Sequence, residues 1–220
     1  MLKNVLFTAI IALGFISCEN SSNDSHLLIH QDGRAKPKLI VLNVLDHSDS
    51  SIPWDLSLEL SDQLTHQLKN YGSLYISNTE NIDDITDVSE LSKKLQRSPF
   101  NVDLKLSDCE FLTSVELIEH RIHPIPQKTN IAHPNAQTHQ LLIKARIKVF
   151  DVRKTNPEII LSEIITHEAL IPWQLSTINY KKNHYLTTQY KITPLGINHK
   201  ILIQNIAKKV HDYVLLAKIR

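Results

Sequence analysis

Residues 38–78 constrain the fold more than any other stretch of this sequence. An apolar run over residues 39–45 is followed by a polar turn, and leucines then recur at every fourth position. The leucines are Leu56, Leu60, Leu64 and Leu68. Such a stripe is typical of an amphipathic helix packed on a core, and Gly72 stands where a helix C-terminal cap belongs. With the apolar residues 74–76, the stretch predicts strand, helix and strand, the βαβ unit of a helix-covered sheet.

The rest of the chain predicts two more helices and three more strands. A helix is expected over residues 81–98, where acids come early and bases late, as the helix dipole favours. Strands are expected over residues 109–117, 141–149 and 158–170, and a long helix begins at Pro194 with Thr193 as its cap. Residues 120–135 contain three prolines and predict a loop. The expected class is α/β shading to α+β, a mixed sheet of about five strands with helices packed on it, in the order β-α-β-α-β-β-β-α.

The N-terminus predicts a lipoprotein signal peptide over residues 1–17. Lys3 precedes an apolar run at residues 5–16 that is too short for a comfortable membrane span. Ser17 and Cys18 at its end resemble a bacterial lipobox, in which the cysteine becomes the lipidated first residue of the mature protein, although Phe15 stands where Leu is usual. The alternatives are an ordinary secretory signal with a chance cysteine, or an uncleaved anchor.

A lipid on Cys18 would hold the protein on a membrane, since each buried methylene of an acyl chain such as palmitate adds about 0.8 kcal/mol. The polar residues 18–37 predict a flexible tether, and residues 38–220 a single globular domain. Glu19, where an inner-membrane retention signal would have Asp, favours the outer membrane, facing the periplasm. Cys109 is then left without a disulfide partner, and it is expected to be a buried apolar residue rather than a nucleophile.

Composition and motifs argue against several functional classes. The chain has 24 basic and 23 acidic residues, so it offers no broad basic field for nucleic acid. Four glycines in 220 residues nearly exclude glycine-rich phosphate loops. GxSxG and HExxH motifs are absent, and the adjacent Asp46, His47 and Ser48 cannot form a triad, because a triad is assembled from distant residues. We therefore expect neither an enzyme nor a cofactor.

Twelve histidines raise the possibility of a metal site. His120 and His123 are three apart, with His133 and His139 nearby. A zinc site needs three or four converging ligands, whereas residues three apart on a strand point to opposite faces. These histidines are accordingly expected to be solvated loop residues, and no metal site is predicted.

The aromatic residues near element boundaries suggest a partner surface. Trp54 is expected to staple the first helix to the core. Four aromatics lie in or beside the irregular residues 174–193: Trp173, Tyr180, Tyr185 and Tyr190. Aromatics on loops are frequent hot spots of protein interfaces, and twenty irregular residues in a compact domain usually have a purpose. We expect these four to bind a partner, with filling of the sheet end as the alternative for Trp173.

Two segments carry a family resemblance. KLIVLNVLDHS followed by LSLELSDQLTHQLKNYGSLYIS resembles the opening of the CsgG-like and LpoB-like envelope lipoproteins, whose domain is similar to the N-terminal domain of TolB. Val149-Phe150-Asp151-Val152 resembles the end of a later strand in that family. The resemblance covers roughly residues 38–170 and rests on general fold signals rather than catalytic motifs.

The resemblance implies a binding or assembly protein. Members of the family activate penicillin-binding proteins or form the curli secretion pore, and a related fold serves lipid-transport ABC systems. We expect a non-enzymatic, lipid-anchored envelope protein that binds another envelope protein, in peptidoglycan synthesis or envelope assembly. The alternative is an oligomeric component of a secretion pore or lipid-transport ABC system. Lys144, Arg146 and Lys148 alternate along one strand and suit a soluble sheet better than a pore wall.

Overall fold

The computed structural model describes residues 28–77, 109–125, 138–154, 157–172, 175, 178–179 and 182–219. It divides the chain into two compact units, Met1–Ala35 and Lys36–Arg220. In the described part of the first unit, Ile29 and Ala35 form an isolated antiparallel bridge, closed by a turn in which Gly33 has a φ of 81°. No helix among the described residues is both long and apolar enough to cross a membrane.

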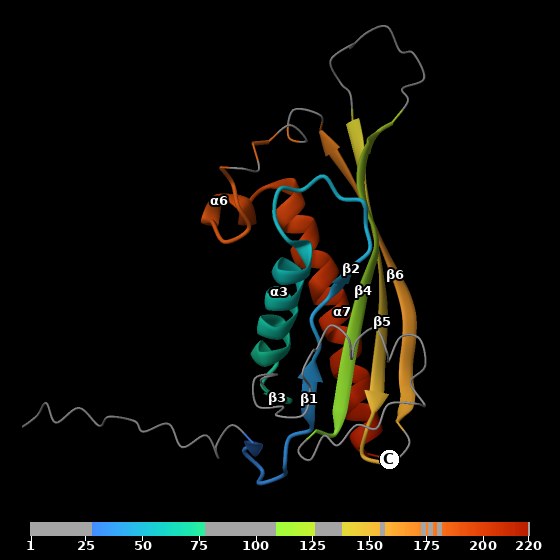
Figure 1. The fold of residues 1–220 in the computed structure, drawn as a ribbon. Coiled ribbons are helices and arrows are strands. Elements are labelled where there is room, and N and C mark those ends of the chain that lie inside the picture. Colours follow the sequence, from blue (N-terminus) through green and yellow to red (C-terminus); the bar gives the residue numbers. More distant parts are fainter. Residues whose placement is uncertain are drawn as a thin grey trace, which may run out of the picture. The chain divides into compact units, whose positions relative to one another are not determined.

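The second unit is built on one mixed sheet (Figure 1). Its main path runs in the order β3 (Tyr75–Ser77), β1 (Lys38–Val41), β4 (Phe111–Pro124), β5 (Thr138–Asp151) and β6 (Glu158–Pro172). The short β2 (Leu45–Asp46) pairs separately with β4 and brings the sheet to six strands. β1 is parallel to both of its neighbours, whereas β4, β5 and β6 pair antiparallel. The predicted α/β class and mixed sheet are confirmed.

The helices are α3 (Leu56–Asn70), α6 (Thr188–Lys191) and α7 (Pro194–Ile219). α3 and α7 lie side by side on one face of the sheet (Figure 1). α3 begins at Asp55, whose carboxylate accepts the backbone N–H of Ser57 at 2.8 Å, and it is followed by Gly72 with a φ of 69°. α7 begins as predicted, because the Thr193 hydroxyl accepts the backbone N–H of Gly196 at 3.1 Å.

The core lies between the sheet and the two long helices. The four leucines of the α3 stripe are buried, each with at most 2% of its surface exposed. Alternate residues of β5 face them, and one side of α7 completes the layer. The β5 residues are Leu141, Ile143, Ala145, Ile147 and Val149, and those of α7 include Leu202, Ile206, Val210 and Val214.

On the opposite face of β5, three charged residues lie between the buried Leu142 and Phe150, and two of the three pair with acids of β4. Arg146 lies 2.6 Å from Glu116, and Lys144 lies 2.7 Å from Glu119. These cross-strand pairs match the alternation expected from the sequence and leave this part of the sheet polar on the side away from the helices.

One predicted loop is wrong at its start. β4 continues through His120 to Pro124, because this stretch pairs with β5 as far as His139. Proline is tolerated there, since it closes the end of the strand. The rest of that predicted loop lies outside the described residues, apart from residue 125. The predicted helix over residues 81–98 lies wholly outside them. The predicted irregular stretch contains the short helix α6, which projects away from the sheet beside the start of α7 (Figure 1).

Candidate functional site

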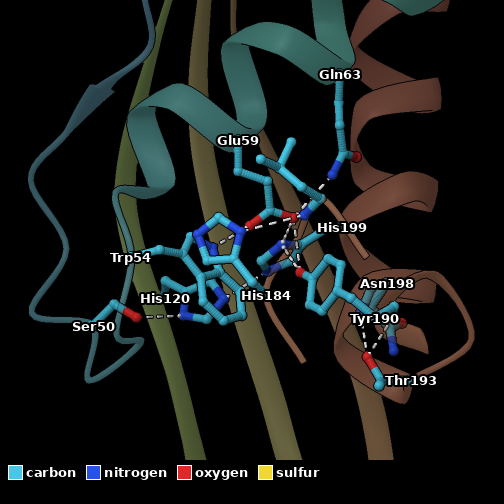
Figure 2. A network of polar contacts seen from close by, with 12 residues as sticks. Ser50, Trp54, Glu59, Gln63, His120, His184, Tyr190, Thr193, Asn198 and His199 are labelled. Atoms are coloured by element: carbon cyan, nitrogen blue, oxygen red, sulfur yellow. Dashed lines mark hydrogen bonds and ion pairs between the residues drawn. The ribbon is translucent and has the colours of Figure 1, made fainter. Parts of the chain in front are cut away.

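A buried carboxylate, that of Glu59, is the centre of a polar cluster at one end of the helix layer (Figure 2). Glu59 follows Leu56 by three residues, so it shares the apolar side of α3 and is completely buried. An ionised carboxylate in such a place is stable only when its oxygens accept several hydrogen bonds.

Four donors reach Glu59 from four segments of the chain: the turn before α3, α3 itself, α6 and α7. Gln63, one turn along α3, donates its side-chain amide at 2.9 Å. The indole N–H of Trp54 donates at 2.8 Å and the hydroxyl of Tyr190 at 2.7 Å. His199 of α7 brings its Nδ1 within 2.8 Å. A carboxylate has about four acceptor positions, so Glu59 is fully hydrogen-bonded.

The cluster continues from His199 to the edge of the core. Nε2 of His199 lies 2.9 Å from Nε2 of His120, and Nδ1 of His120 lies 3.1 Å from the Ser50 hydroxyl. Every contact can have one donor: the Nδ1–H of His199 donates to Glu59, and the tautomers decide which partner donates in the His199–His120 and His120–Ser50 contacts. We call these seven residues the Glu59 cluster: Ser50, Trp54, Glu59, Gln63, His120, Tyr190 and His199 (Figure 2).

A β-bulge in β4 points His120 into the core. Residues of β4 up to Leu117 pair in register with β5, and the register shifts between Leu117 and Glu119. The inserted Ile118 changes which face the later residues occupy, so that His120 pairs with the core residue Ile143. Without the bulge, His120 would point to the charged side of the sheet, as Glu116 does.

The environment sets the charges in the cluster. Burial alone raises the pKa of Glu59, but the hydrogen bond and charge of His199, with the bonds from Trp54 and Tyr190, outweigh it and lower the pKa. Burial, helped by the neighbouring His199, lowers the pKa of His120 to about 3. Glu59 is therefore ionised and His120 neutral at physiological pH.

Aromatic rings around Trp54 cover the cluster. The indole ring meets Tyr190 edge-on with centroids 5.3 Å apart, and His184 at the same separation. Trp54 is half-buried against the core, as the predicted staple of the first helix requires. Because Tyr190 and Trp54 both donate to Glu59, the start of α3 is tied to α6.

The predicted partner-binding aromatics lie in different places. Tyr190 is buried, with 1% of its surface exposed, so it supports its segment from beneath. Tyr185 is half-exposed and packs beside Trp54. Trp173, Tyr180 and the predicted lipidation site Cys18 lie outside the residues whose side chains are described.

Cys109 is half-buried, rather than fully buried as predicted, and it is a free cysteine. Its thiol donates to the Phe111 carbonyl oxygen at 2.7 Å. Burial raises the pKa of the Cys109 thiol to about 12, which keeps the group protonated and unreactive.

The prediction of solvated loop histidines is wrong for the three that the structure describes, because His120, His123 and His139 all lie in strands. His120 is buried in the Glu59 cluster, while His123 lies on the opposite face of β4, as its spacing of three residues predicts. His139 is part of β5, and His133 lies outside the described residues. Among the residues that the structure describes, no three His, Cys, Asp or Glu side chains gather as metal ligands would.

A groove of about 670 Å³ lies next to the cluster, between α3, α6 and α7. Gln63 and Tyr190 belong to both, since each lines the groove and donates to Glu59. We call it the α3–α7 groove; it is lined by Asp62, Gln63, His66, Gln67, Asn70, Tyr185, Leu186, Tyr190, Lys191, Gly196, Lys200, Ile203 and Gln204.

The comparisons with known proteins identify the family. A family model described as "Family of unknown function (DUF7499)" matches residues 25–218. The chain belongs to this family. The match includes every element of the sheet and both long helices of this DUF7499 member. No curated protein matches the chain.

Solved structures similar to this DUF7499 member include one hypothetical protein and two lipoproteins. The hypothetical protein CT253 from Chlamydia trachomatis has 19% identity and a TM-score of 0.64, covering 82% of this chain and 98% of its own. A minor lipoprotein from Acinetobacter baumannii has 13% identity and a TM-score of 0.39, covering 80% and 91%. The LpoB C-terminal domain from Salmonella enterica has 13% identity and a TM-score of 0.34, covering 65% and 90%. The first similarity supports the fold.

Sequence reasoning missed four residues of the Glu59 cluster, namely Ser50, Glu59, Gln63 and His199, and the last three lie on helices. Glu59 and His199 both lie on the apolar side of a correctly predicted helix: Glu59 three residues after Leu56, and His199 three before Leu202. A polar residue on such a stripe signals a buried hydrogen-bonded group. That the two side chains meet depends on how α3 and α7 pack, which the periodicity of either helix does not determine.

Proposed function

We propose that this protein is a non-enzymatic, lipid-anchored envelope protein that binds another envelope protein through the surface around α6. Cys18 would carry the lipid, with residues 1–17 removed, residues 18–37 as a tether and residues 38–220 as the binding domain. The outer membrane, facing the periplasm, is the proposed location, and the CsgG-like and LpoB-like lipoproteins with their TolB-like domain are the proposed relatives.

The observation that carries this proposal is a run of exposed apolar side chains on a fixed segment. Leu186, Ile192 and Ile197 lie within twelve residues of one another, and 72%, 76% and 45% of their surfaces are exposed. Large apolar residues gathered in this way are typical of protein-binding surfaces. Tyr190 holds the segment in place through Glu59, so a partner would meet a pre-formed surface and less ordering entropy would be lost on binding.

Crosslinking from defined positions tests the partner. A photoreactive amino acid replaces Leu186 or Ile192, and in a matched control it replaces Leu58, which is exposed on α3. We expect one envelope protein to be crosslinked from positions 186 and 192 but not from 58. The same partner should bind the purified protein saturably, and more weakly after Ile192→Asp. Equal crosslinking from all three positions would remove the α6 surface as the binding site.

The anchor is tested separately by intact mass. Protein from the membrane fraction is expected to start at residue 18 and to carry a diacylglyceryl mass, which Cys18→Ser abolishes together with membrane retention. An unmodified Cys18 behind a cleaved leader would make this a soluble periplasmic protein.

A further inference from the structure

We propose that the α3–α7 groove binds a saccharide carrying a single carboxylate. The inference is independent of the lipid anchor and of the protein partner proposed above. At about 670 Å³, the groove falls within the size range of small-ligand sites and has room for a sugar of two units.

The two long walls of the groove present one polar stripe each. On α3, Gln63 and Gln67 are four residues apart, and on α7, Lys200 and Gln204 have the same spacing. Residues four apart lie above one another on a helix, so each helix directs both side chains of its own pair into the groove. A ligand lying along the groove would therefore meet amide groups from both sides.

The amides suit hydroxyl and acetamido groups. Gln67 and Gln204 have no side-chain hydrogen-bond partner among the described residues, and each offers two donors and one acceptor oxygen. A sugar hydroxyl both donates and accepts, so it is matched by such amides better than by a carboxylate or an ammonium group alone. The half-exposed Tyr185 at the end of the groove adds an aromatic surface for the apolar face of a sugar ring.

The charges of the groove call for one negative charge on the ligand. Lys191 and Lys200 line it and form no ion pair with any described carboxylate, and Asp62 is the acidic residue among the lining side chains. Two lysines and one aspartate leave a net charge of +1. One carboxylate would balance it, whereas a phosphate dianion would leave the groove with a net charge of −1.

The floor of the groove is held by the Glu59 cluster. Gln63 and Tyr190 each donate to Glu59, and the buried Gly196 and Ile203 lie beside them. Because the floor side chains are already fixed, a ligand would not have to order them, and the loss of freedom on binding would fall on the two lysines, Gln67 and Gln204.

Calorimetric titration of the full-length protein, purified in detergent, tests the inference. The first probe is the disaccharide of N-acetylglucosamine and N-acetylmuramic acid, which has one carboxylate, and the second is its neutral counterpart, the N-acetylglucosamine dimer. We expect the acidic sugar to bind about tenfold or more tightly than the neutral one, and Lys200→Gln to remove that difference, since hydrogen bonds to charged groups contribute this much.

Two variants complete the test. Gln67→Ala is expected to weaken binding of both sugars, because the amide of Gln67 would bond hydroxyl or acetamido groups that both sugars carry. Lys208→Gln is the matched control, as Lys208 is exposed on α7 but does not line the groove, and it should leave both affinities unchanged. Equal binding of the two sugars, no binding of either at millimolar concentration, or equal effects of Lys200→Gln and Lys208→Gln would overturn the inference. Circular dichroism of each variant establishes that it is folded.

Discussion

Glu59 shows how one side chain fixes the position of several segments. Its carboxylate accepts from α3, from the Trp54 turn, from α6 and from α7, so four parts of the chain meet at a single group. Each donor would lose its partner if the carboxylate moved, and burial denies it water as a substitute. The position of α6 therefore depends on hydrogen bonds to Glu59 as well as on apolar contact.

Removing one donor from Glu59 should be costly. Tyr190→Phe deletes the hydroxyl that lies 2.7 Å from the carboxylate and leaves a buried charge with one bond fewer. We expect a loss of about 1.5–3 kcal/mol in the free energy of unfolding, measured by urea denaturation. Tyr185→Phe is the control, because Tyr185 is half-exposed, and it should change stability by less than about 0.5 kcal/mol. Similar small effects of both changes would contradict the role given to Tyr190.

His120 should make the protein sensitive to acid. Its pKa is about 3 in the folded protein against 6.5 for an ordinary histidine, so between these values the unfolded chain binds one more proton. The free energy of unfolding should therefore fall as pH decreases from about 6.5, by up to about 1.4 kcal/mol per pH unit. Urea denaturation at pH 7, 6, 5 and 4 should give a shallower slope for His120→Gln, which lacks the titrating group while Glu59 and His199 remain. Parallel slopes for the two proteins would refute this explanation.

At the scale of elements, the junction of α6 and α7 depends on a glycine. A Cβ atom on Gly196 would fall well inside van der Waals contact with the Tyr190 carbonyl oxygen and 3.0 Å from the carbonyl carbon. The last turn of α6 can approach the first turn of α7 only because this side chain is absent.

Gly196→Ala should destabilise the protein, although alanine favours helices. Its propensity gains about 1 kcal/mol within a helix, but the clash with a backbone carbonyl should outweigh this and give a net loss of about 1–3 kcal/mol. Lys208→Ala, at an exposed position of α7, should be neutral or slightly stabilising in the same thermal or urea unfolding experiment. A stabilised Gly196→Ala protein would show that α6 moves away without cost.

The sequence predicted the long elements and the short strand β3, and it missed β2 and α6. The leucine stripe of α3 and the alternation of β5 repeat over enough residues to be recognised, and the Thr193–Pro194 start of α7 has a local cause in side-chain capping. β2 has two residues and α6 has four, too few for any period to appear. The Glu59 cluster was missed because its bonds join residues up to 140 positions apart, as between Glu59 and His199.

At the scale of the whole molecule, the second unit should fold without the residues before it. Among the residues that the structure describes, the buried apolar residues of the core lie between Leu39 and Ala217, within Lys36–Arg220. A chain beginning at Lys36 keeps Pro37, whose carbonyl oxygen accepts the backbone N–H of Tyr75 at 2.9 Å. We expect its free energy of unfolding to lie within about 0.5 kcal/mol of the full chain's, with one cooperative transition by urea denaturation. A broadened or multiphasic transition would show that the preceding residues contribute to the fold.

The bulge in β4 implies that this strand tolerates changes of residue more readily than changes of length. Deleting Ile118 alone would restore an uninterrupted alternation and exchange the inward and outward positions of every later residue of the strand. His120 would then turn toward the charged face, and Ile122 would leave the core. Among descendants of this gene, insertions and deletions between Leu117 and Pro124 should therefore be rare or occur in pairs, whereas single substitutions accumulate on the outward positions.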